Sequence, residues 1–291
     1  MIETTTSSGN RIEWFKYSPY FILHAGCLAV FWVGTSKIAI TLALALYLAR
    51  MFFITGFYHR YFSHRAFKTS RLAQFIFAFL GCTAGQRGPI WWAAHHRHHH
   101  RLSDRPDDTH SPYQGGWIMS HAGWFMQTKN QSIRERYVQD WQRYPELVWL
   151  EKWELLPFLL LAIGMVGAGW IIGQYFPGTE TSAMQLFVWF LISTVAVYHG
   201  TYTINSLCHI WGSRRFETDD HSRNNPILAL ITLGEGWHNN HHWYPMAAQQ
   251  GLKWWEIDIT YYLLRLMAAL GLIWDLRSYP KSKLASYTVN E

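Results

Sequence analysis

Charged residues are scarce in this 291-residue chain. Asp, Glu, Lys and Arg make up 15% of it, against about 25% in ordinary soluble domains. Together with 49% hydrophobic and 17% aromatic residues, this excludes a typical soluble protein and indicates one that enters a membrane. The mean hydropathy of -0.08 is still near neutral, so a large part of the chain must face water.

Cysteine and basic runs are scarce as well. The three cysteines, Cys27, Cys82 and Cys208, share no metal-site spacing and are too few for a disulfide framework, so we expect reduced packing residues. The net charge is +6, but no dense basic run accompanies it, and we expect no nucleic-acid partner. The polar start "MIETTTSSGNRIEW" predicts no cleaved signal peptide.

Four apolar stretches are candidates for crossing a bilayer, at about residues 20–34, 37–56, 155–176 and 183–205. They form two pairs with short turns, as expected for helical hairpins of nearly 20 residues per span, although the first is short. The sequence therefore predicts an all-α integral membrane protein, with residues 1–291 forming one domain. Residues 57–154 and 206–291 would form a helical cap.

The orientation follows from the charges. An even number of crossings returns both termini and the cap to one side of the membrane, and nearly all Lys and Arg lie on that side. The positive-inside rule then makes both termini and the cap cytoplasmic. Two further apolar stretches, residues 72–92 and 254–274, carry charges that are costly at the bilayer centre, so we expect interfacial helices there.

Histidine is abundant, with 16 residues, and it is concentrated in the motifs "HRYFSH", "HRHHH", "HNNHH" and "NSLCHIWG". The nine candidate metal ligands in these motifs are His59, His64, His96, His99, His100, His209, His238, His241 and His242. All of them lie on the predicted cytoplasmic side or at its boundary. Nine imidazoles exceed what a tetrahedral zinc site uses and no Cys contributes, which favours two metal ions, and imidazole suits iron.

The spacing makes finer predictions. On a helix the positions i, i+3 and i+4 share a face, so "HRHHH" and "HNNHH" are each expected to converge on one metal. His59 and His64 lie about 140° apart on an ideal helix, so we expect them to serve two metals or to straddle a helix end. His24 and His199 are expected to be packed residues.

The remaining polar candidates would support the ligands from behind. A metal-bound imidazole needs a partner for its other ring nitrogen. The candidate partners and surface residues are His95, His98, His110, His121, His221, Asp108, Asp219, Asp220 and Glu235.

Taken together, "GFYHRYFSH", "WWAAHHRHHH", "SHAGW", "NSLCHIWG" and "GEGWHNNHH" resemble the motifs of the membrane fatty acyl desaturases of the stearoyl-CoA (Δ9) type. The resemblance covers most of the chain. It implies that the nine histidines ligate two irons and that Asn205 meets one iron through water. It also implies that O2 is used to form a cis double bond in a saturated acyl chain.

The resemblance further implies a bent apolar tunnel. Gln86, Trp92 and Thr201 match the residues at its kink, and Tyr47 and Met51 fall where the family closes it around the methyl end. Plain helix packing is the alternative role for these five. Met51 is bulkier than the small residue usual in the animal enzymes, which predicts a preference for chains of about palmitoyl size over longer ones.

The acyl carrier and the electron source are separate questions. The predicted substrate is an acyl-CoA of palmitoyl to stearoyl length, but Ala94 and His95 replace an Arg and Asp pair that contacts CoA in the animal enzymes. An acyl carrier protein or a glycerolipid is the alternative.

The chain has no "HPGG" haem motif and no glycine-rich nucleotide motif, so an external carrier must deliver electrons: ferredoxin, rubredoxin or cytochrome b5 with its reductase. A candidate docking face comprises Arg134, Arg136, Arg214, Arg215 and Arg223.

Two other functions use similar residues. A membrane diiron hydroxylase also has His-rich motifs, but the contexts "NSLCHIWG" and "GEGWHNNHH" favour desaturation. A metal transporter would place ligands along the membrane helices, whereas the dense clusters lie outside them.

Overall fold

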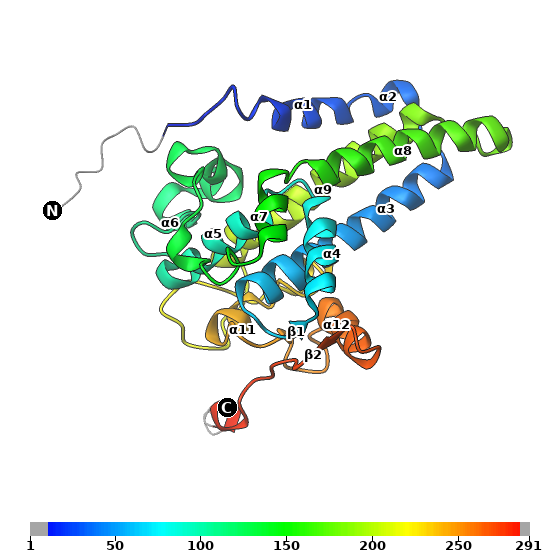
Figure 1. Ribbon diagram of the computed structural model, residues 1–291. Helices are drawn as coiled ribbons and strands as arrows, with labels where there is room; N and C mark the ends of the chain where they lie inside the picture. Colours follow the sequence, from blue (N-terminus) through cyan, green and yellow to red (C-terminus); the bar gives the residue numbers. More distant parts are fainter. Residues whose placement is uncertain (1–10, 286–291) are drawn as a thin grey trace.

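Three long helices dominate the computed structural model, which describes residues 11–285 (Figure 1). The first runs without a break over Lys37–Ser63 and comprises α3 (Lys37–Phe52) and the π-helix η2 (Phe53–Ser63). The others are α8 (Leu156–Tyr175) and α9 (Ala183–Ile210). Each is long and apolar enough to cross a membrane.

The first predicted span, at residues 20–34, has a different form. It consists of α1 (Ser18–Cys27) and the single turn α2 (Val30–Val33), a shorter apolar segment that packs along α9. Contact with α9 is close at Gly26, where a Cβ atom would lie 2.8 Å from Leu191 Cδ1. The structure thus has three long apolar helices among the described residues, and the fourth crossing stays a prediction.

Helix α9 is the centre of the membrane-facing part. It packs against α3 and α8 as well as α1. Its start is fixed by a capping box, in which the Ser182 hydroxyl accepts from the Gln185 N–H and the Gln185 side chain accepts from the Ser182 N–H. Helix α8 approaches this start through Gly169, where a Cβ would lie 2.6 Å from the Ser182 carbonyl oxygen.

Two of the long helices continue past the predicted membrane boundaries. The segment predicted to end at residue 56 stays helical to Ser63, and the one predicted to end at residue 205 continues to Ile210. A cap beginning at residues 57 and 206 is therefore not set off by a helix break. The helices carry His59 and His209 directly into the cap, because the ladder of backbone hydrogen bonds continues through both boundaries.

The cap surrounds these two helix ends at one side of the molecule (Figure 1). Its other helices of six or more residues are α4 (Arg71–Cys82), α5 (Pro89–Leu102), α7 (Pro145–Lys152), α10 (Pro226–Ile231), α11 (His238–Trp243) and α12 (Ile259–Ala269). The shorter ones are α6 (Pro112–Gly115), η3 (Met119–Gly123), η4 (Trp124–Met126), η5 (Thr128–Asn130), η6 (Glu135–Tyr137) and α13 (Lys281–Ala285), while η7 (Pro177–Thr179) lies outside the cap, between α8 and α9. Strands β1 (Lys68–Thr69) and β2 (Ile273–Trp274) form one short antiparallel pair.

Helices α4 and α12 come from the two stretches that were expected at the interface. Both expose apolar side chains, including Leu72 at 70% and Leu266 at 56%. The stretch at 72–92 does not form one helix, because Gly85 and Arg87 adopt positive φ angles of 67° and 70° between α4 and α5. This turn redirects the chain into α5, which carries the histidine motif.

The start of α5 is held by α7. The Glu151 carboxylate accepts hydrogen bonds from the backbone N–H groups of Ile90 (2.8 Å) and Trp91 (3.1 Å), two of the donors that a helix N-terminus leaves unpaired. The approach requires glycine at position 88, where a Cβ would collide with the same carboxylate. Burial raises the pKa of Glu151 to about 7, and the Glu154 carboxylate adds to the rise.

This pKa predicts a pH-dependent stability. Between its ordinary value and about 7, folded Glu151 keeps a proton that the unfolded chain has lost, so stability should fall as the pH rises through this window. Glu151→Gln should flatten the dependence of the thermal unfolding midpoint in detergent between pH 5 and 8. Glu146→Gln is the control, since the pKa of this half-buried α7 residue is lowered by its hydrogen bond to Arg71. Equal slopes in all three proteins would contradict the prediction.

Candidate metal centre

The nine predicted ligands come from five segments and meet inside the cap. His59 lies on η2 and His64 follows its end, while α9 supplies His209. Helix α5 supplies His96, His99 and His100, and α11 supplies His238, His241 and His242. All nine side chains are buried or half-buried. Their ring nitrogens form two separate groups.

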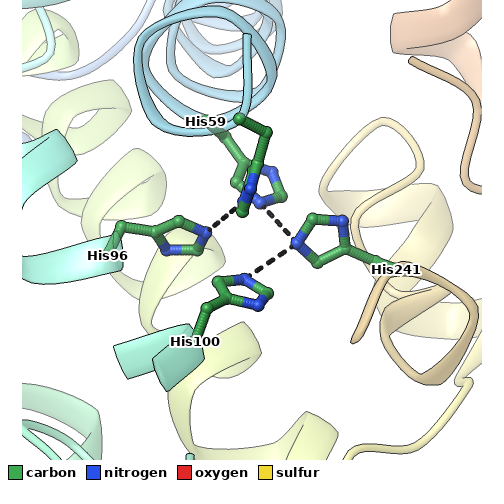
Figure 2. Close-up of side chains that lie close together, drawn as sticks. His59, His96, His100 and His241 are labelled. Carbon is green, nitrogen blue, oxygen red and sulfur yellow. Dashed lines mark hydrogen bonds between the residues drawn. The ribbon is translucent and has the colours of Figure 1, made fainter. Parts of the chain in front are cut away.

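The five-histidine group consists of His59, His64, His96, His100 and His241. Its Nε2 atoms face one another: the Nε2–Nε2 distances are 2.9 Å for His59–His241, 2.8 Å for His64–His96 and 3.0 Å for His100–His241. Figure 2 shows four of these rings, from η2, α5 and α11, pointing toward a common centre.

The four-histidine group consists of His99, His209, His238 and His242. The Nε2 atoms of His209 and His238 lie 3.1 Å apart. The Nε2 atoms of His99 and His242 are buried and have no hydrogen-bond partner among the described residues. The four ligand nitrogens thus lie within 4.8 Å of one another.

The grouping corrects the prediction that each helical motif converges on one metal. On α5, His96 and His100 join one group while His99 joins the other. On α11, His238 and His242 stay together, and His241 is the one that separates. The reason is angular: position i+4 lies about 40° from i, whereas i+3 lies about 60° to the other side. Each helix therefore contributes to both groups.

His59 and His64 belong to the same group, so the expectation that they serve different metals is wrong. The π-helix explains this, because its repeat places residues i and i+5 together rather than 140° apart. The His64 N–H donates to the His59 carbonyl at 3.3 Å, which is an i+5 bond. The other expectation, that the pair straddles a helix end, holds, since η2 ends at Ser63.

Carboxylates contact the outward ring nitrogens of four of these histidines. The Nδ1–carboxylate distances are 2.8 Å for His99–Asp108, 2.8 Å for His209–Asp104 and 2.6 Å for His242–Asp220, and His59 Nδ1 contacts Glu235 in the same manner. An N–H at Nδ1 fixes the tautomer, so the lone pair of each ring lies on Nε2 and points into its group.

Three of these carboxylates were expected partners, and one was missed. Asp219 was also expected, but it is 91% exposed and pairs with Arg105. Asp104 takes its place from the "SDRPDD" loop, where it adopts a positive φ of 59°. Three aspartates closely following a histidine helix were the signal in the sequence. The stretch at residues 103–116 is irregular apart from α6, which lies within it.

Burial and neighbouring charges shift the pKa values of the imidazoles in both directions and keep the carboxylates charged. Burial lowers the pKa of His96, His100 and His241, and neighbouring imidazoles lower it further. Burial raises the pKa of Asp104, but the hydrogen bond and charge of His209 outweigh it and hold the pKa at about 2. The pKa of Glu235 is likewise about 2, because His59 and Arg60 outweigh its burial.

These residues fit metal ions. A histidine nitrogen binds a metal such as zinc at about 2.1 Å, so two nitrogens bound at a right angle to each other lie about 3.0 Å apart. The observed Nε2–Nε2 distances are 2.8 to 3.1 Å. If no metal were bound, rings whose protons lie at Nδ1 would face one another with unprotonated nitrogens at these distances, and their lone pairs would repel. Each group therefore offers a metal site made of imidazole nitrogens.

The other histidines lie outside both groups. His24, His199 and His121 form a chain of ring contacts, with nitrogens 3.0 and 2.9 Å apart, in line with the packed roles expected of His24 and His199. His95 and His98 contact backbone carbonyls. His221 is exposed, and its ring contacts that of Tyr113 in a tilted arrangement.

His110 has a more prominent position than its sequence suggested. It is 6% exposed, its ring lies 4.1 Å from that of His99, and its Nδ1 is unpartnered among the described residues. Together with His99 and Asp108 it forms a third cluster of possible ligand atoms.

Two adjoining cavities reach the histidines. The larger, of about 590 Å³, extends from the starts of α1 and α8 to Trp92, His96 and Asn205. The smaller, of about 30 Å³, continues past these residues to Met51 and Thr55 and touches both histidine groups. Because the two cavities share Trp92, His96 and Asn205, we treat them together as one passage, which is mostly apolar in its larger part and reaches Met51 through the smaller part.

The predicted tunnel residues lie along this passage, with one exception. Gln86 lines the larger cavity and donates to Thr201 Oγ1 at 3.0 Å, while Trp92 and Thr201 line both cavities. Met51 lines the smaller one. Tyr47 lines neither: its hydroxyl donates to the Ile231 carbonyl at 2.7 Å.

Asn205 also lines both cavities, one helical turn before His209. Its predicted contact with an iron through water stays a prediction. Two of the arginines predicted to form a docking face have partners within the chain. Arg215 donates two hydrogen bonds to Glu256, and Arg223 donates to the Gly212 carbonyl.

Comparison with known proteins identifies the class. Residues 36–275 match the model of a family described as fatty acid desaturase. The chain belongs to the fatty acid desaturase family, and the resemblance seen in its motifs is confirmed. As a family member with three long apolar helices, it is a membrane protein.

Several curated relatives are similar over most of the chain. A probable chloroplastic lipid desaturase of Arabidopsis thaliana is 40% identical over 223 residues, which are 75% of this chain and 58% of that protein. Icosanoyl-CoA 5-desaturase of Limnanthes douglasii is 34% identical over 86% of this chain and 68% of its own length. The sn-2 palmitoyl-lipid 9-desaturase of a Nostoc species is 33% identical over 93% of this chain and 92% of its own. The chain thus spans less than two thirds of the first of these relatives.

The geometry predicts the metal content of purified protein. His100→Ala and His238→Ala each remove a ring from one group, so each should lower the metal content by about half or more relative to the wild type, as measured by elemental mass spectrometry. His221→Ala is the matched control, because its exposed ring belongs to neither group. Unchanged metal in both group variants would contradict the assignment.

Proposed function

We propose that this protein uses O2 to introduce a cis double bond, near carbon 9, into a saturated fatty acyl chain of about palmitoyl to stearoyl length. The observation that carries the proposal is the narrow apolar passage that touches both histidine groups. In the overall reaction, the saturated chain, O2, two electrons and two protons yield the unsaturated chain and two waters.

The metal ligands are proposed to be the nine histidines, holding two iron ions with Asn205 beside the four-histidine group. Two irons bound there would supply the activation of O2 that an unactivated C–H bond requires. Contacts at Nδ1 keep the rings in the ligating tautomer.

The passage would position the acyl chain beside the histidine groups. Trp92 and Thr201 lie where the two cavities meet, and the bond from Gln86 to Thr201 joins the turn before α5 to α9 at that point. A chain bent around this junction would present its central methylenes to the histidine groups while its apolar surface excludes water. Such constraint would select both the carbon pair and the cis geometry.

The carrier of the acyl chain is proposed to be CoA, as the motifs indicate, with a membrane lipid as the second candidate. The mouth of the larger cavity favours the lipid. It is bordered by Ile22 and Leu155, exposed at 66% and 59%, on the apolar segments at α1 and α8. Apolar side chains exposed there suit entry from a bilayer. The electron donor is proposed to be a separate ferredoxin, rubredoxin or cytochrome b5.

Expression in a host tests the activity. New double bonds should appear in the host lipids, located by mass spectrometry of derivatised fatty acids, and His99→Ala should abolish them because its buried Nε2 is a proposed ligand. His221→Ala should retain the product. A product heavier by one oxygen would show a hydroxylase instead, and full activity of the His99 variant would contradict the proposal.

Chain length should depend on Met51, which is 1% exposed at the closed end of the passage. Met51→Ala should raise the ratio of stearoyl to palmitoyl product about 10-fold, since two more buried methylenes gain about 0.8 kcal/mol each. The ratio is measured by feeding both chains together. Met165→Ala is the control, because it truncates a buried methionine that lines neither cavity. The same ratio in all three proteins would assign Met51 to packing alone.

A further inference from the structure

Carboxylates are distributed unequally behind the two histidine groups. In the four-histidine group, His99, His209 and His242 each place Nδ1 against an aspartate. In the five-histidine group, His59 alone contacts a carboxylate at Nδ1 among the described residues. The group with fewer rings thus has three times as many acidic partners.

The three aspartates keep their negative charge uncompensated. Within the described part of the chain, none of Asp104, Asp108 and Asp220 forms an ion pair with Lys or Arg. Their other partners are neutral donors. The Ser111 hydroxyl and the His221 N–H bond to Asp104, and the Ser222 hydroxyl bonds to Asp220 at 2.6 Å. Beside four imidazoles, this corner of the cap carries three full negative charges.

The five-histidine group has less negative surroundings. Its single carboxylate, Glu235, also accepts from Arg60 Nε at 3.1 Å and Nη2 at 2.9 Å, so a buried guanidinium that is shared with Asp258 offsets part of its charge. A second guanidinium, that of Arg97, donates to the Ser63 carbonyl at 2.8 Å, directly before His64, and pairs with Asp140. Less negative charge therefore remains beside this group than beside the four-histidine group.

On the basis of the proposed function, we infer that the two metal positions are inequivalent. The four-histidine position holds its ion more firmly and is the last to be emptied. Asp104, Asp108 and Asp220 act as positioning residues that raise the donor strength of His209, His99 and His242. Hydrogen bonds from ligand imidazoles to carboxylates increase ligand basicity, and their loss costs 10- to 100-fold in metal affinity.

The fifth imidazole of the other group does not reverse this order. An imidazole contributes a neutral lone pair, whereas an aspartate contributes a full charge whose attraction for a cation persists over several ångströms in a buried site. Three carboxylates without a Lys or Arg partner beside one group, against a single carboxylate that is paired with Arg60 beside the other, favour the cation at the four-histidine position.

Removal of iron from the ferrous holoenzyme tests the inference. The purified full-length protein, loaded with two irons, is mixed with excess of a colorimetric ferrous chelator, and release is followed over time together with residual iron. Two phases of one equivalent each are expected. Asp220→Asn and Asp108→Asn should each accelerate the slow phase about 10-fold or more and leave the fast phase unchanged. Glu235→Gln should affect the fast phase only.

Asp219→Asn is the matched control, because this neighbour of Asp220 is 91% exposed and contacts Arg105 rather than a histidine. A second readout separates tuning of the metal from general loosening: in Mössbauer spectra of the iron-57 protein, Asp220→Asn should shift one of two quadrupole doublets and leave the other in place. Retention of both doublets also verifies that the variant is folded.

The outcomes are distinct. A single release phase, or a slow phase that responds to Glu235→Gln and not to the aspartate variants, would overturn the inference while leaving desaturation intact. An active wild type without iron would overturn the proposed function itself.

Discussion

Nine imidazole rings share one small buried volume, and the rest of the structure depends on how their protons are kept away from the middle. A buried ring that gained a second proton would face other cations at short range, and burial with neighbouring rings lowers the pKa of His96, His100 and His241 for that reason. Carboxylates at the periphery then hold four Nδ1 protons outward. The cap surrounds this arrangement, and its loops at residues 104–108 and 218–222 are shaped by it.

The membrane-facing part contributes more than an anchor. Lys37–Ser63 and α9 enter the cap as unbroken helices, and each ends in ligand candidates, so the histidine groups are built on the same bodies that border the apolar passage. Arg60 also links the long helix to the cap, because its guanidinium binds both Glu235 and Asp258. A substrate channel and a metal centre formed on separate domains would have no such fixed relation.

Much of this was predictable from the sequence, and the failures have physical causes. The long apolar helices and the nine histidines were readable because composition and spacing are local properties. The division into groups of five and four was not, since it depends on which neighbour each face of α5 and α11 meets. The pairing of His59 with His64 required a π-helix, and nothing in "FITGFYHRYFS" distinguishes that from an α-helix. Asp104 was missed because a loop aspartate becomes a partner only through tertiary packing.

One consequence follows from the unbroken helix Lys37–Ser63. Met51 lines the smaller cavity and His59 belongs to the five-histidine group, and the two residues are eight positions apart on the same helix. The end of the smaller cavity at Met51 and the position of His59 are therefore fixed relative to each other, because one continuous helix carries both and bending of the cap cannot change the distance between them. A substitution at position 51 would therefore change the space beside the histidine groups without moving the histidines themselves.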